Sequence, residues 1–206
     1  MNLIGETRVG VLASGRGSNF AAIVRKASAG YFAKASFQYL ICNVSTAGAL
    51  EVAQKANIPC QAMRPRGFES PQAYESAIVQ AMDSVGIEWL VLAGYMKIVG
   101  PTILDRYKNR ILNIHPSLLP SFPGLHAQEQ AITHGVRISG CTVHLVDGGL
   151  DSGPIIGQRS VEVLETDTAA DLADRILVQE HELYSECLKR VTEQPWHIDG
   201  RRIIFD

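Results

Sequence analysis

Short apolar runs alternate with helix-like segments through the first half of the chain, and this alternation limits the available folds more than any other feature. The apolar runs cover residues 8–13, 37–42, 89–93 and 111–114. They lack a polar face, which is typical of strands buried on both sides. Helix-like compositions separate these runs, over residues 18–30, 46–56 and 71–85. The sequence therefore predicts an α/β fold with a doubly wound, mostly parallel sheet.

The second half of the chain has a different pattern. Segments 138–146 and 154–163 are joined by a loop rich in glycine and aspartate, so we expect them to pair as antiparallel strands. A long helix follows over about 168–191, with Asp167 and Thr168 as candidate N-terminal caps. We therefore expect one domain of residues 1–206 with an antiparallel C-terminal extension, a long C-terminal helix and a short terminal strand.

Charge and cysteine usage argue against several classes of partner. The formal net charge is −2 and the basic residues are scattered, so no nucleic-acid surface is expected. No apolar run reaches the roughly 18 residues of a membrane span, and the N-terminus does not resemble a signal peptide. The four cysteines are widely separated, which is typical of a reduced cytoplasmic protein without a metal-ligand cluster.

A glycine-rich turn of sequence ASGRGSN, residues 13–19, joins the first predicted strand to the first helix. Glycine lets the backbone approach a ligand closely, and the N–H groups at a helix N-terminus attract anions. Three interpretations stay open: a phosphate monoester site, a plain structural turn, and a dinucleotide site. Phe20 replaces the third glycine of a dinucleotide motif, and the second strand ends at Asn43 without an acidic residue for the ribose.

Asn113 and His115 lie two residues apart, so their side chains share one face of the strand that begins at residue 111. Buried polar groups need partners, so each has either an internal partner or a ligand. Ligands of open α/β sheets bind beyond the carboxyl ends of the strands, where this pair and segment 94–98 both fall. That position favours a ligand site over a pair of satisfied core residues.

Two loops add to this region. Residues 116–124 contain three prolines, which fix the backbone of the loop after His115. Residues 147–154 form a glycine-rich loop with two carboxylates, Asp147 and Asp151. This second loop is either a hairpin turn or the source of a carboxylate that orients and charges His115 while its glycines admit a flat ring.

Glu180 falls near the centre of the apolar stripe of the last helix, at 100° per residue. An unpaired buried carboxylate is expensive. Glu180 is therefore either paired internally or directed at a ligand.

Four stretches together resemble the formyltransferase family that uses 10-formyltetrahydrofolate: SGRGSN, LAGYMKI, NIHPSLLPSFPGLHA and GCTVHLVDGGLDSGPII. The resemblance runs from about Arg8 to about Val191. It implies an enzyme that moves a formyl group to the amine of glycinamide ribonucleotide in purine biosynthesis. The half of about 1–110 would bind the phosphate, and the half of about 111–206 would bind folate and catalyse transfer. Its partners would be these small molecules, without a metal, a membrane or nucleic acid, in a monomer or homodimer.

The resemblance also assigns roles by position. It implies a catalytic trio of Asn113, His115 and Asp151. The phosphoribosyl group would contact Gly17, Ser18, Asn19 and Glu180. The folate pocket would include Met96, Lys97, Ile98, Val99, Asn113, Asp147 and Asp151. A cis peptide bond is implied between Leu119 and Pro120. Pro71 and Gly148 depart from the arginine and the glutamate that many relatives carry at these places.

Formyl transfer proceeds through a tetrahedral intermediate with a negative oxygen, and donors aimed at that oxygen supply much of the catalysis. We assign the Asn113 amide and His115 to this role. A carboxylate at Asp151 would favour the protonated imidazole, which is the better donor. One of the three groups, directly or through water, would carry the proton from the amine to the departing folate nitrogen.

Several related activities compete with this interpretation. A methionyl-tRNA formyltransferase should carry a basic C-terminal domain, and a formyltetrahydrofolate deformylase should carry an N-terminal regulatory domain. A sugar-nucleotide formyltransferase has no reason for SGRGSN at the first turn. A non-catalytic nucleotide-binding module would need that turn without the trio of Asn113, His115 and Asp151.

Overall fold

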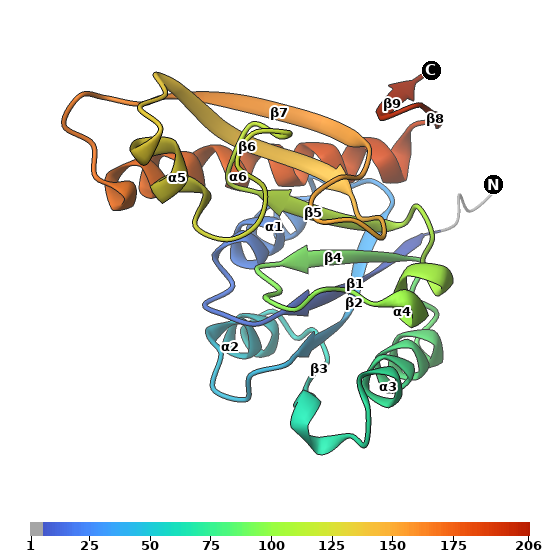
Figure 1. Cartoon of the computed structure of the whole chain (residues 1–206). Helices are drawn as coiled ribbons and strands as arrows, with labels where there is room; N and C mark the ends of the chain where they lie inside the picture. The colour runs from blue at the N-terminus through green and yellow to red at the C-terminus, as the bar shows by residue number, and fades with distance from the viewer. Residues whose placement is uncertain (1–5) are drawn as a thin grey trace. The chain divides into compact units, whose positions relative to one another are not determined.

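A computed structural model describes residues 6–206 of the chain. The chain divides into two compact units, with the boundary between Leu112 and Asn113. The first unit contains β1 (Thr7–Ala13), α1 (Ser18–Ser28), β2 (Ala35–Cys42), α2 (Gly48–Lys55), β3 (Cys60–Ala62), a 3-10 turn (Pro65–Gly67), α3 (Pro71–Ser84), β4 (Trp89–Ala93) and α4 (Pro101–Arg106). Strand β5 (Ile111–His115) spans the boundary. These elements are labelled in Figure 1.

The strands of the first unit follow the order β3-β2-β1-β4, and every pair within it is parallel. Residues 9 and 11–13 of β1 have no exposed surface, and β4 is buried throughout. This confirms the parallel α/β fold expected from the apolar runs. Strand β3 and helix α4 were not expected, because three and six residues are too few to show a period.

The second unit contains α5 (Ala127–Thr133), β6 (Ile138–Leu145), β7 (Ile155–Glu162), α6 (Ala169–Glu193), β8 (Trp196–Asp199) and β9 (Arg202–Phe205). Its strand order is β5-β6-β7-β9-β8. Strands β6 and β7 pair antiparallel, as do β8 and β9, which confirms the antiparallel extension. Helix α6 packs along β6 and β7 (Figure 1). No helix within residues 6–206 is long and apolar enough to cross a membrane.

Helix α6 begins with a capping box. The Thr168 hydroxyl accepts the Asp171 N–H at 3.2 Å, and the Asp171 carboxylate accepts the Thr168 N–H at 2.9 Å. Of the two candidate caps, Thr168 is the N-cap, because its side chain satisfies an N–H group that the helix leaves free. Asp167 instead pairs with Arg175, and this guanidinium lowers the pKa of the Asp167 carboxyl to about 2.

Two side chains, the buried Thr142 of β6 and Gln158 of β7, hold the proline-rich loop that follows β5. The Thr142 hydroxyl donates to the Ser117 carbonyl at 2.7 Å and accepts the Leu119 N–H at 3.0 Å. The Gln158 amide donates to the Leu119 carbonyl and to Thr142, both at 2.9 Å. The Leu119-Pro120 bond is cis, as the resemblance implied. Side chains of β6 and β7 therefore hold the backbone that follows His115.

Replacing Thr142 by Val is expected to destabilise the protein by about 2 kcal/mol or more, because a buried N–H and a buried carbonyl lose their partner. Thr142→Ser keeps the hydroxyl and is the matched control. Urea denaturation of the two variants measures the difference. A Val variant as stable as the Ser variant would show that the hydroxyl does not hold this loop.

Candidate active site

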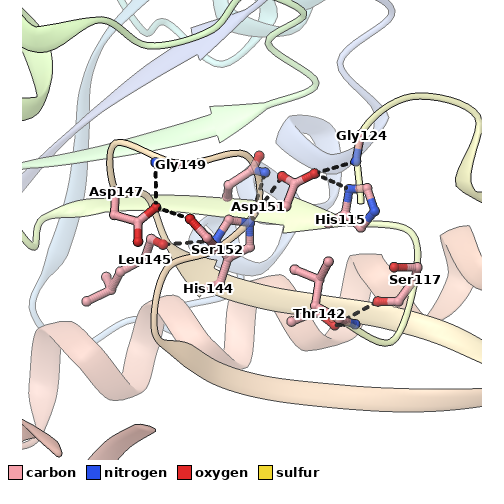
Figure 2. A network of polar contacts seen from close by, with 12 residues as sticks. His115, Ser117, Gly124, Thr142, His144, Leu145, Asp147, Gly149, Asp151 and Ser152 are labelled. Atoms are coloured by element: carbon pink, nitrogen blue, oxygen red, sulfur yellow. Dashed lines mark hydrogen bonds and ion pairs between the residues drawn. The ribbon is translucent and has the colours of Figure 1, made fainter. Parts of the chain in front are cut away.

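His115, at the end of β5, lies between two acceptors. Its side chain is buried, with Nδ1 3.4 Å from Asp151 Oδ2 and Nε2 2.8 Å from the Phe122 carbonyl oxygen. Asp151 comes from the loop between β6 and β7, and its Oδ2 also accepts the Gly124 N–H at 2.8 Å (Figure 2). This arrangement satisfies both N–H groups of a protonated imidazole. A direct bond from His115 to a substrate oxygen therefore requires one of these contacts to open.

Asn113 contacts a second buried histidine, His144 of β6, with 3.2 Å between Asn113 Nδ2 and His144 Nε2. His144 Nδ1 lies 2.8 Å from the Leu145 carbonyl oxygen, which can only accept, so the ring proton is on Nδ1. Burial lowers the pKa of His144, although the Leu145 carbonyl and Asp151 both oppose this effect. A neutral His144 then accepts one Asn113 N–H, which fixes the amide orientation and leaves the other N–H for a ligand.

Sequence reasoning missed His144. It lies two residues after Thr142 in a strand that is otherwise apolar over its last part, and only 2% of it is exposed. Like Asn113 and His115, His144 is a polar side chain in a buried strand, and this pattern could have indicated it. The backbone groups of Phe122, Gly124 and Leu145 gave no such signal, because any residue carries them.

Asp147, which the resemblance placed in the folate pocket, shapes its own loop. Its Oδ1 accepts the Ser152 hydroxyl at 2.6 Å and the Gly149 N–H at 3.1 Å (Figure 2). Asp151 adopts φ 49° in this loop, a left-handed conformation that aspartate and asparagine tolerate better than most residues. Gly148 lies at the exposed turn of the loop.

The glycine-rich turn lies in the first unit. Residues 15–19, together with Ala93, Gly94 and Met96, line a cavity of about 160 Å³. Gly17 is the N-cap of α1 with φ 77°, and a Cβ at this position would come within 2.8 Å of Ala49 Cα. Only glycine fits there, and the first N–H groups of the eleven-residue helix α1 follow it. A phosphate at this turn stays a prediction.

Gly17→Ala is expected to weaken phosphate-ester binding roughly tenfold or more, because a left-handed residue with a new Cβ displaces the turn from α2. Gly67→Ala, outside the residues that line this cavity, is the control, since a Cβ there meets no atom within 4 Å. Titration of each variant with glycinamide ribonucleotide measures the dissociation constant. Equal affinity in Gly17→Ala and the parent would remove this turn from the binding site.

The other expected folate contacts differ in exposure. Met96 and Ile98 are 71% and 87% exposed, which leaves large apolar side chains open to a ligand. Val99 is buried. Pro71 is the first residue of α3, where proline is favoured because its missing N–H would be free in any case.

Glu180 is 7% exposed, which confirms that it lies within the buried stripe of α6. It acts on Cys141 of β6, whose thiol pKa rises to about 12, first through burial and then through the Glu180 charge. Contact of Glu180 with a phosphoribosyl group stays a prediction.

Comparison with known proteins relates this arrangement to one family. The formyl transferase family model matches residues 7–188. Phosphoribosylglycinamide formyltransferase of Bacillus subtilis (strain 168) is 42% identical over 88% of this chain and 92% of that protein. The protein of the same name from Escherichia coli (strain K12) is 37% identical over 93% of this chain and 87% of that protein. Glycinamide ribonucleotide transformylase 1 from Symbiobacterium toebii has a crystal structure that superposes with a TM-score of 0.94, at 43% identity, over 97% of this chain and 94% of that chain.

Proposed function

We propose, because the chain belongs to the formyl transferase family, that it transfers a formyl group from 10-formyltetrahydrofolate to the amine of glycinamide ribonucleotide. This reaction would be its step in purine biosynthesis. The phosphoribosyl group would contact Gly17, Ser18, Asn19 and Glu180, and the folate would lie against Met96, Lys97 and Ile98.

One observation carries the proposal. Asn113 and His115 from β5 and Asp151 from a loop far along the chain belong to one network, which His144 completes. An amide donor, a histidine and a carboxylate are the groups that acyl transfer to an amine requires. His115 and Asp151 are both largely buried, and burial strengthens the electrostatic effect of polar groups on a nearby reacting centre.

In the proposed mechanism the substrate amine attacks the formyl carbon, and negative charge develops on the formyl oxygen. The second Asn113 N–H would donate to that oxygen, because the first is held by His144. His115, between Asp151 and the Phe122 carbonyl, would supply positive charge through space. Asp151, directly or through water, would move the amine proton to the departing folate nitrogen, which leaves as tetrahydrofolate.

An ultraviolet assay of the folate product tests the proposal. We expect the product to accumulate with glycinamide ribonucleotide as acceptor and to form far more slowly with water alone. Equal rates with and without the ribonucleotide would indicate a hydrolase instead. No product under either condition would also contradict the proposed activity.

A further inference from the structure

A single short segment, residues 122–124, contacts both His115 and Asp151. The Phe122 carbonyl accepts from His115 Nε2 at 2.8 Å, and the Gly124 N–H donates to Asp151 Oδ2 at 2.8 Å. His115 belongs to β5 and Asp151 to the β6–β7 loop, so this segment joins two groups that different elements supply. Both contacts use backbone atoms, so they depend on the conformation of the segment and not on its side-chain chemistry.

The backbone conformation of this segment is unfavourable for Phe122. Phe122 has φ 53°, a left-handed conformation that bulky residues rarely adopt, and Gly124 has φ 82°. A phenylalanine in this region persists only where surrounding contacts impose it. A contact that holds Phe122 therefore helps to keep residues 122–124 in this conformation.

The contact that holds Phe122 comes from His134, the residue that follows α5. The two rings lie with their centroids 5.3 Å apart and their planes inclined at 48°. His134 Nδ1 donates to the Gln130 carbonyl at 2.8 Å, which fixes the imidazole to the last turn of α5. The Gln130 side chain in turn donates to the Leu125 carbonyl at 2.9 Å, so α5 holds the segment's end as well.

We propose that His134 is a positioning residue that acts through Phe122 on the His115–Asp151 pair. It touches neither member of the pair, and its ring keeps residues 122–124 in the conformation that presents one carbonyl and one N–H to them. The effect of His134 on turnover rests on the proposed formyl transfer. Its effect on the conformation of residues 122–124 does not.

Three variants separate this role from a general effect on the fold. His134→Ala removes the ring, His134→Phe keeps an aromatic ring without a titratable group, and Thr133→Ala changes the exposed neighbour on α5. The first readout is the hydrogen-exchange rate of the Gly124 amide by NMR. Loss of the free energy contributed by one aromatic pair should raise this rate roughly three- to tenfold. The Phe variant and the Thr133 variant should exchange like the parent.

The second readout compares kcat with the dissociation constant for glycinamide ribonucleotide. In His134→Ala we expect kcat to fall roughly three- to tenfold, because the ring contact with Phe122 is lost. The dissociation constant for glycinamide ribonucleotide should stay within a factor of two. His134→Phe should restore kcat.

Unchanged Gly124 exchange in His134→Ala would overturn the proposal, as would an Ala variant with parental kcat or a Phe variant as impaired as the Ala variant. If the parent transfers no formyl group, the proposed function fails, and the Gly124 exchange rate still decides whether His134 holds the segment.

Discussion

Asn113→Ala is expected to lower kcat by roughly 10²-fold or more, the usual consequence of deleting one donor to a developing oxyanion. The amide is oriented by His144, whose ring proton is held by the Leu145 carbonyl, so the free N–H has a defined direction. Alanine at position 113 removes this donor and also the Asn113 N–H that contacts His144 Nε2.

Affinity for glycinamide ribonucleotide should change little in this variant, because the predicted phosphate site is built from the β1–α1 turn. Steady-state kinetics with a titration of the ribonucleotide separates the two effects. Near-normal kcat would make Asn113 a structural polar residue, and a lost affinity with normal kcat would place it in substrate binding alone.

Asp151→Asn is expected to keep the fold and lower kcat at least as much. Asparagine tolerates the left-handed φ of 49°, and its side-chain oxygen can still accept the Gly124 N–H. The substitution removes only the negative charge, 3.4 Å from His115, and the proton acceptor. Without that charge, a protonated His115 would lose its counter-ion, and the amine proton would lose its proposed carrier.

Asp174→Asn on the exposed face of α6 is the matched control and should leave kcat unchanged. Circular dichroism and the thermal midpoint of the Asp151 variant establish whether the fold is kept. A folded Asp151→Asn protein with parental turnover would exclude the carboxylate from the chemistry.

The sequence was sufficient for most of the fold because long periodic segments carry a strong signal. Helix α6 runs over 25 residues, and its apolar stripe and its two candidate caps, Asp167 and Thr168, could be inferred from residue types alone. Strands β3 and β8 escaped prediction because three or four residues show no period. The position of β8 depends on pairing with β9, which a single-chain pattern does not reveal.

Part of the candidate site could likewise be inferred from the sequence, and part could not. Asn113 and His115 stood out as polar side chains at the end of a buried strand, and Glu180 stood out in the apolar stripe of α6. The hydrogen bond of His115 to the Phe122 carbonyl could not be inferred, because it depends on a left-handed residue in an irregular loop. Because of this bond, direct donation from His115 to a substrate oxygen would require one of its contacts to open.

The most direct test of the proposed function follows the formyl group itself. The parent protein is mixed with a folate donor carrying ¹³C in the formyl group and with glycinamide ribonucleotide, and the products are identified by mass spectrometry. We expect the label to appear on the ribonucleotide, one formyl group for each folate consumed, and Asn113→Ala to slow this transfer roughly 10²-fold. Label released as free formate, at a rate that the ribonucleotide does not change, would contradict the proposed function.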